Sequence, residues 1–76
     1  METRIVRLEE HFWHIRSPEG ALAAEEQQEL KAYLDEVRLP YQLIDGAPGI
    51  PGAVSWEVVY EVLGHYYDGR ADVLPF

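Results

Sequence analysis

The sequence predicts a small α+β domain, with strands, a helix, a strand and a second helix in chain order and the two helices packed on a small sheet. Residues 22–37 and 55–68 have the apolar spacing of amphipathic helices. Residues 41–44 are a short β-favouring run, and residues 3–16 are rich in β-branched and aromatic side chains. A three-helix bundle is the alternative, because residues 3–16 can also be placed on a helix.

Length and composition predict one globular domain over residues 1–76. A chain of 76 residues buries only a little over half of its unfolded surface, so its core must be small and well filled. The hydrophobic fraction of 47%, with two Trp, five Tyr and two Phe, is too high for a disordered chain. The chain has no cysteine, which excludes disulfides and Cys-based zinc sites.

Residues 3–16 fit two patterns. Ile5, Leu8, Phe12 and Ile15 have helical spacing, but the β-branched and aromatic side chains around them favour strands. Extended structure with a bend or an irregular hairpin near residues 9–10 is the preferred interpretation.

The segment 22–37 is the clearer helix, because it is rich in Ala, Glu, Gln, Leu and Lys. Its inward stripe is predicted to be Leu30, Tyr33, Leu34 and Val37, and the acidic residues Glu25, Glu29 and Glu36 are expected to face water. Pro40 cannot continue this helix. If residues 5–8 are also a strand, the strand at 41–44 completes a right-handed βαβ crossover, with helix 22–37 on one face of the sheet and the last helix on what remains.

The segment 46–54 contains three glycines and two prolines and is predicted to be a structural connector. Gly46, Gly49 and Gly52 precede a helix start at Ser55, which suggests a phosphate-binding loop. No Lys-Ser or Lys-Thr follows the last glycine, so this hypothesis is not favoured.

Helix 55–68 is apolar over more than half of its circumference. The apolar side comprises Trp56, Val58, Val59, Tyr60, Val62, Leu63, Tyr66 and Tyr67. A core this small cannot hold all of these rings, so at least one of the tyrosines, together with Val58 or Val62, is expected to remain partly exposed. Glu57, Glu61 and Asp68 share the remaining strip.

The net charge is −8, from six Lys and Arg against fourteen Asp and Glu. Such a field repels phosphate backbones and anionic lipids and speeds encounter with basic surfaces, so direct binding to nucleic acid or membranes is not expected. No apolar run reaches the ~20 residues of a membrane span, and the N-terminal residues do not have the order of a signal peptide. A cytoplasmic location is therefore expected.

The chain contains no catalytic motif. Glu57 and Glu61 lie one turn apart on a solvated strip, where nothing removes them from water, so general acid–base catalysis is not expected. His11 and His14 would share a face only on a helix, which is the less favoured interpretation there. We expect no enzyme activity, no cofactor and no metal.

Small size, acidity and aromatic content together favour a protein-binding module, an inhibitor or adaptor that occupies a basic surface of a larger protein, for example a surface that binds nucleic acid. Phage-encoded inhibitors and nucleic-acid mimics have this composition, an analogy of composition only. The alternative is a structural or accessory subunit, or a homodimer, that buries the apolar face of helix 55–68. The candidate contact residues are Glu57, Glu61, Asp68, Tyr60, Tyr66, Tyr67, Glu25, Glu29 and Glu36.

Overall fold

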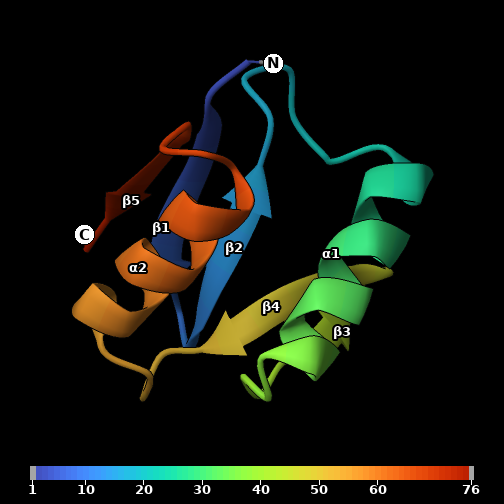
Figure 1. Ribbon diagram of the computed structural model, residues 1–76. Coiled ribbons are helices and arrows are strands. Elements are labelled where there is room, and N and C mark those ends of the chain that lie inside the picture. Colours follow the sequence, from blue (N-terminus) through green and yellow to red (C-terminus); the bar gives the residue numbers. More distant parts are fainter. Residues whose placement is uncertain (1, 76) are drawn as a thin grey trace.

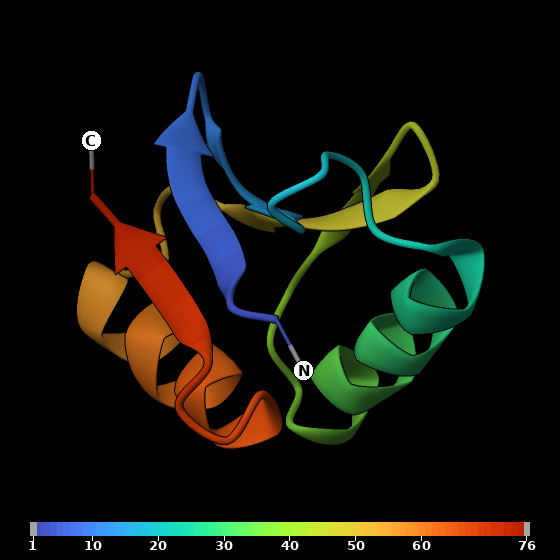
Figure 2. The same ribbon diagram turned by 90° about the horizontal axis from the view of Figure 1, so that it is seen from above.

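The computed structural model describes residues 2–75, and it folds them into a five-stranded sheet with two helices on one face (Figure 1, Figure 2). The elements are β1 (Arg4–Glu9), β2 (Phe12–Arg16), α1 (Ala24–Glu36), β3 (Gln42–Ile44), β4 (Ala47–Pro51), α2 (Trp56–Tyr66) and β5 (Ala71–Leu74). The α+β prediction is confirmed. The three-helix bundle is not supported, because the first segment forms two strands.

The strand order is β3-β4-β2-β1-β5, with β1 parallel to β5 and every other pair antiparallel. The chain crosses from β2 to β3 through α1 and from β4 to β5 through α2. The two crossovers start on antiparallel strands, β2 and β4, and lead toward opposite edges of the sheet. Because both differences reverse the side on which a crossover lies, two right-handed crossovers place α1 and α2 on the same face. Figure 2 shows the two helices side by side below the sheet.

One topological expectation needs correction. The first crossover starts from β2 and not from residues 5–8, because β1 and β2 form a hairpin before the helix begins. Its turn is formed by Glu10 and His11, and Glu10 has a positive φ of 58°. The expected bend near residues 9–10 is confirmed.

The prediction that residues 46–54 are only a connector is wrong, because Ala47–Pro51 is β4, which lies between β2 and β3. Asp45 and Gly46 have φ values of 53° and 85°, as a two-residue type I′ hairpin turn requires. Gly49 is buried within the sheet, where an added Cβ would lie 2.7 Å from Cδ1 of Ile44. Gly46 and Gly49 therefore serve the β3–β4 hairpin.

Two prolines occupy β4 without removing a hydrogen bond between paired strands. The register directs the nitrogen of Pro48 toward β2. The β2–β4 pairing stops at His14 and Gly49, however, so Pro48 has no paired residue on β2 that would need an N–H donor. The nitrogen of Pro51 points to the other side, beyond Gln42, where β3 has not yet begun. Proline is tolerated at both positions because neither needs an N–H donor.

The core lies between the sheet and the two helices. Its members are the buried apolar side chains Val6, Trp13, Ile15, Leu22, Leu30, Leu34, Ile50, Val59, Leu63, Tyr67, Ala71 and Val73. The predicted stripe residues Leu34, Val59 and Leu63 are fully buried. The prediction that Val37 faces inward is wrong, because Val37 follows the last turn of α1 and is 40% exposed.

Both helices end sooner than predicted because the chain turns into the left-handed region. After α1, Arg38 has φ 61° and the Leu39 N–H donates to the Leu34 carbonyl at 3.0 Å. After α2, Asp68 has φ 54° and the Gly69 N–H donates to the Gly64 carbonyl. These bonds satisfy the last carbonyls of each helix.

Candidate protein-binding surface

The exposed side of the first turns of α2 carries large apolar and acidic side chains together. Trp56, Val58 and Tyr60 are 39%, 41% and 53% exposed, whereas Val59 between them is fully buried. Glu57 and Glu61 are exposed on the same turns. We call Trp56, Glu57, Val58, Tyr60 and Glu61 the α2 surface.

Two contacts hold the aromatic part of the α2 surface in place. The Trp56 indole N–H donates to the Val73 carbonyl of β5 at 2.7 Å. The Trp56 and Tyr60 rings lie 5.1 Å apart between centroids. Tyr60 and Val58 confirm that part of the apolar side of this helix remains exposed. Trp56, although predicted on the inward side, is anchored to the sheet edge and is also partly exposed.

Tyr66 and Tyr67 do not belong to this surface. Tyr67 is only 2% exposed, and Tyr66 is half-buried. The Tyr66 ring packs 4.7 Å from Tyr33 of α1 and edge-on against Tyr67. Tyr67 must therefore be removed from the candidate contact residues, because a side chain buried between the helices cannot touch a partner.

The Tyr67 hydroxyl belongs to a polar cluster that joins three elements. It donates to Oε2 of Glu26 at 2.8 Å, and Arg4 donates to both carboxylate oxygens of Glu26 at 2.7 Å. The hydrogen bond from Arg4 is the main cause that lowers the pKa of Glu26. Burial raises the pKa of Tyr67, and the bond to Glu26 adds to this effect. The cluster fastens α1 to β1 and to the C-terminal end of α2.

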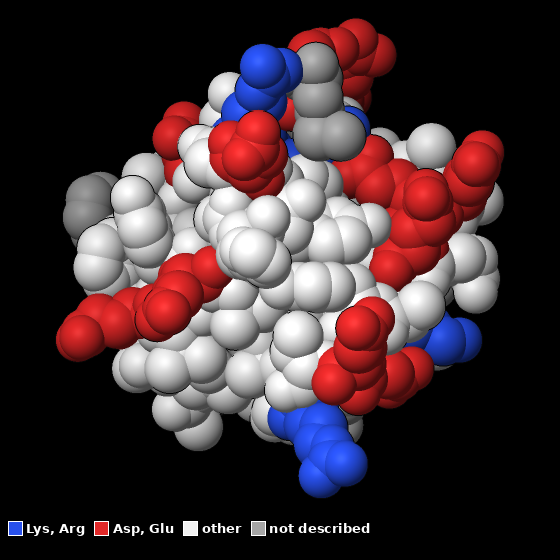
Figure 3. Space-filling view, in the orientation of Figure 1, with Lys and Arg blue, Asp and Glu red and all other residues white. Residues whose placement is uncertain are grey.

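The predicted acidic positions are all exposed. Glu25, Glu29 and Glu36 lie on α1, and Asp68 follows α2. Figure 3 shows the helix-covered side of the molecule, with acidic groups around a broad neutral area. The structure therefore brings Glu57 and Glu61 together with Tyr60, whereas the acids of α1 lie on a different helix of the same face.

The face of the sheet that the helices leave uncovered carries some of the positive charge. Val6 and Ile15 point into the core, so Arg7 and Arg16 on the alternate positions point away from the helices. Both arginines are exposed, and Arg16 pairs with Glu9 at 2.8 Å. Glu9 and Asp72 lie on the same uncovered face, because they alternate with the buried Val6 and Val73, so the two arginines are balanced there by two acids.

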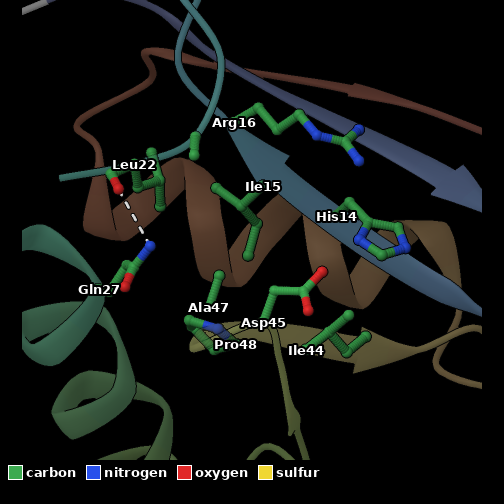
Figure 4. Close-up of a pocket in the computed structure, with 10 residues that line it drawn as sticks. His14, Ile15, Arg16, Leu22, Gln27, Ile44, Asp45, Ala47 and Pro48 are labelled. Atoms are coloured by element: carbon green, nitrogen blue, oxygen red, sulfur yellow. Dashed lines mark hydrogen bonds between the residues drawn. The ribbon is translucent and has the colours of Figure 1, made fainter. Parts of the chain in front are cut away.

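A cavity of about 180 Å³ opens where the β2–β4 pairing stops (Figure 4). It is lined by His14, Ile15, Arg16, Ala21, Leu22, Gln27, Ile44, Asp45, Ala47 and Pro48. The amide of Gln27 donates to the Leu22 carbonyl at 3.0 Å, and the guanidinium of Arg16 is paired with Glu9. Within residues 2–75, no three His, Cys, Asp or Glu side chains are close enough to hold a metal ion.

Neither α1 nor α2, the helices formed within residues 2–75, is long and apolar enough to cross a bilayer. Comparisons of the chain with protein-family models, with curated proteins and with solved structures found no match.

Proposed function

We propose that this protein is a small acidic binding module, an inhibitor or adaptor that docks its α2 surface on a basic surface of a larger protein. The observation that carries the proposal is the position of Trp56, Val58 and Tyr60 beside Glu57 and Glu61 on one rigid helix. Binding, without chemistry on a substrate, is the activity that such a surface supports.

The apolar side chains supply the contact. Tyr and Trp dominate the energies of protein interfaces because they bury large rings at low entropic cost. The Trp56 ring is already fixed by its bond to Val73, so little side-chain freedom remains to be lost on binding.

The acidic side chains orient the encounter with the partner and raise the association rate. A net charge of −8 attracts a basic partner over long range, and Glu57 and Glu61 beside the apolar contact residues favour encounters that present the α2 surface. A basic surface that binds nucleic acid is one class of target with the required charge.

A homodimer or accessory subunit is the second candidate, favoured by the exposed apolar part of the α2 surface. Two copies joined across a two-fold axis at α2 would bring Glu57 and Glu61 close to their own symmetry mates. Like charges at an interface are costly, which favours a different, basic partner.

A set of variants tests the proposal on a partner captured from a lysate of the source organism. Glu57→Lys with Glu61→Lys is expected to weaken the equilibrium affinity by about tenfold or more. Tyr60→Ser is expected to cost on the order of 1–2 kcal/mol of binding free energy. The matched control is Glu2→Lys with Glu19→Lys, which changes the total charge equally at exposed positions outside the helices.

The control double variant should bind within about threefold of the wild type, since distant charges are screened. Equal affinity of all variants would rule out the α2 surface as the docking site. A dimer that is insensitive to salt and is broken by Tyr60→Ser would support the second candidate instead.

A further inference from the structure

The two edges of the sheet differ in how they are closed. At β5, the register points the Val73 carbonyl away from β1, and the Trp56 indole N–H donates a hydrogen bond to it at 2.7 Å. Pro75, directly after β5, has no N–H to offer. These two features block the addition of a strand at β5.

Among residues 2–75, no comparable contact protects the β3 edge. Ile44 pairs with Ala47 and Gln42 with Gly49, so the backbone N–H and C=O of Leu43 between them point away from β4, where the sheet has no further strand. The Leu43 side chain is 55% exposed, the largest fraction among the large apolar side chains of residues 2–75. An exposed backbone and an exposed leucine coincide at this edge.

A hollow of about 500 Å³ lies beside this strand. It is lined by Leu34, Asp35, Arg38, Leu39, Pro40, Tyr41 and Leu43. Val37, at the end of α1, is 40% exposed. An apolar side chain from an added strand would pack in this hollow, on the same face of the sheet as α1.

Charge decides what kind of strand fits. Asp35, in the lining of the hollow, and Asp45, directly after β3, are exposed, and Arg38 lines the hollow beside Asp35. A second copy of this chain would bring another charge of −8 to the same edge, whereas a basic segment would be attracted.

We propose that β3 accepts one additional strand, an extended Lys- or Arg-bearing segment of another protein that pairs with the Leu43 backbone and places an apolar side chain in the hollow. This goes beyond docking through the α2 surface, because α2 packs against β5 at the opposite edge of the sheet. Since β3 has only three residues, the pairing is short, and the hollow and the charge must contribute to affinity.

The test is a titration of the ¹⁵N-labelled protein with a short capped peptide of alternating lysine and valine, followed by amide NMR. At saturation the Leu43 amide should shift and its hydrogen exchange should slow by about tenfold or more, because it becomes hydrogen-bonded. A glutamate–valine peptide should produce neither effect. A lysine–valine peptide N-methylated at its valines should lose most of the affinity, because the residue that places its side chain in the hollow is also the residue whose N–H faces Leu43.

Leu43→Pro provides the protein-side control, since it removes an N–H that faces away from β4. This variant should bind the lysine–valine peptide at least about tenfold more weakly, whereas Tyr60→Ser, on α2, should bind it normally. If only the amide signals of the acidic residues on α1 and α2 shifted and the Leu43 amide signal did not, the proposal would be overturned. Equal binding of the N-methylated peptide, or β3 shifts that depend on protein concentration without peptide, would overturn it as well.

Discussion

Glu26 shows how one acidic side chain can serve the fold while its neighbours remain available on the surface. Its carboxylate accepts two hydrogen bonds from Arg4 and one from Tyr67, and its side chain is 18% exposed. Glu25, one residue earlier, is exposed. The partners of Glu26 come from β1 and from the end of α2, so the pattern of residues within α1 does not predict them.

This cluster makes stability depend on pH. The pKa of Glu26 is lower in the folded state than in the unfolded chain, so its stabilisation is present above the ordinary carboxylate pKa and is lost as pH falls through the folded value. We expect Glu26→Gln to lower the free energy of unfolding at neutral pH by about 1–3 kcal/mol and to flatten its decline below about pH 5. Denaturant unfolding between neutral and acidic pH measures both effects, with Glu25→Gln as the matched control. An unchanged acid profile in Glu26→Gln would mean that the cluster is not formed in solution.

Substitution of the single residue Leu63 tests the packing of the core. It is fully buried, so Leu63→Ala should cost on the order of 2–5 kcal/mol. Val58→Ala on the same helix, at a site 41% exposed, should cost less than about 1 kcal/mol. Chemical denaturation of both variants checks the phase of α2, and similar losses in the two would contradict it.

Among the elements, β4 and β5 were the parts that the sequence did not predict. Pro48, Gly49 and Pro51 suggest a loop, and only the register shows that neither proline faces a strand that needs its N–H. The Asp45-Gly46 pair was the available signal, since such a pair between apolar runs favours a two-residue hairpin. The two helices, the N-terminal hairpin and β3 were predictable because their patterns are local.

The end of α1 offers a test of helix termination. Arg38 is in the left-handed region, which costs a residue with a Cβ about 1–2 kcal/mol relative to glycine. Arg38→Gly should therefore be more stable than Arg38→Ala by about 1 kcal/mol. Both variants remove the same charge, so thermal unfolding of the pair isolates the backbone effect, and equal stability would contradict it.

The β5 edge offers another test. Trp56→Phe keeps an aromatic ring but frees the Val73 carbonyl, and we expect a loss of about 1 kcal/mol and increased self-association. Sedimentation and denaturant unfolding measure the two effects. A monomeric variant of unchanged stability would show that the indole bond does not protect the edge.

At the scale of the whole molecule, the sequence predicts two acidic rows but cannot place them relative to each other. The crossovers through α1 and α2 put both helices on one face of the sheet (Figure 2), which brings Glu25, Glu29 and Glu36 of α1 to the same side as Glu57 and Glu61 of α2. That outcome depends on strand order, which is set by β4 and β5, the two elements that the sequence left unrecognised.

The association rate with the captured partner, measured by stopped flow across ionic strength, tests the proposed function most directly. The rate should fall steeply as salt passes about 0.1 M, where the screening length is about 10 Å. Glu57→Lys with Glu61→Lys should slow association at low salt and leave the free energy of unfolding within about 0.5 kcal/mol, because exposed charges contribute little to stability. A rate independent of salt, or an unchanged rate in the double variant, would contradict docking of the α2 surface on a basic partner.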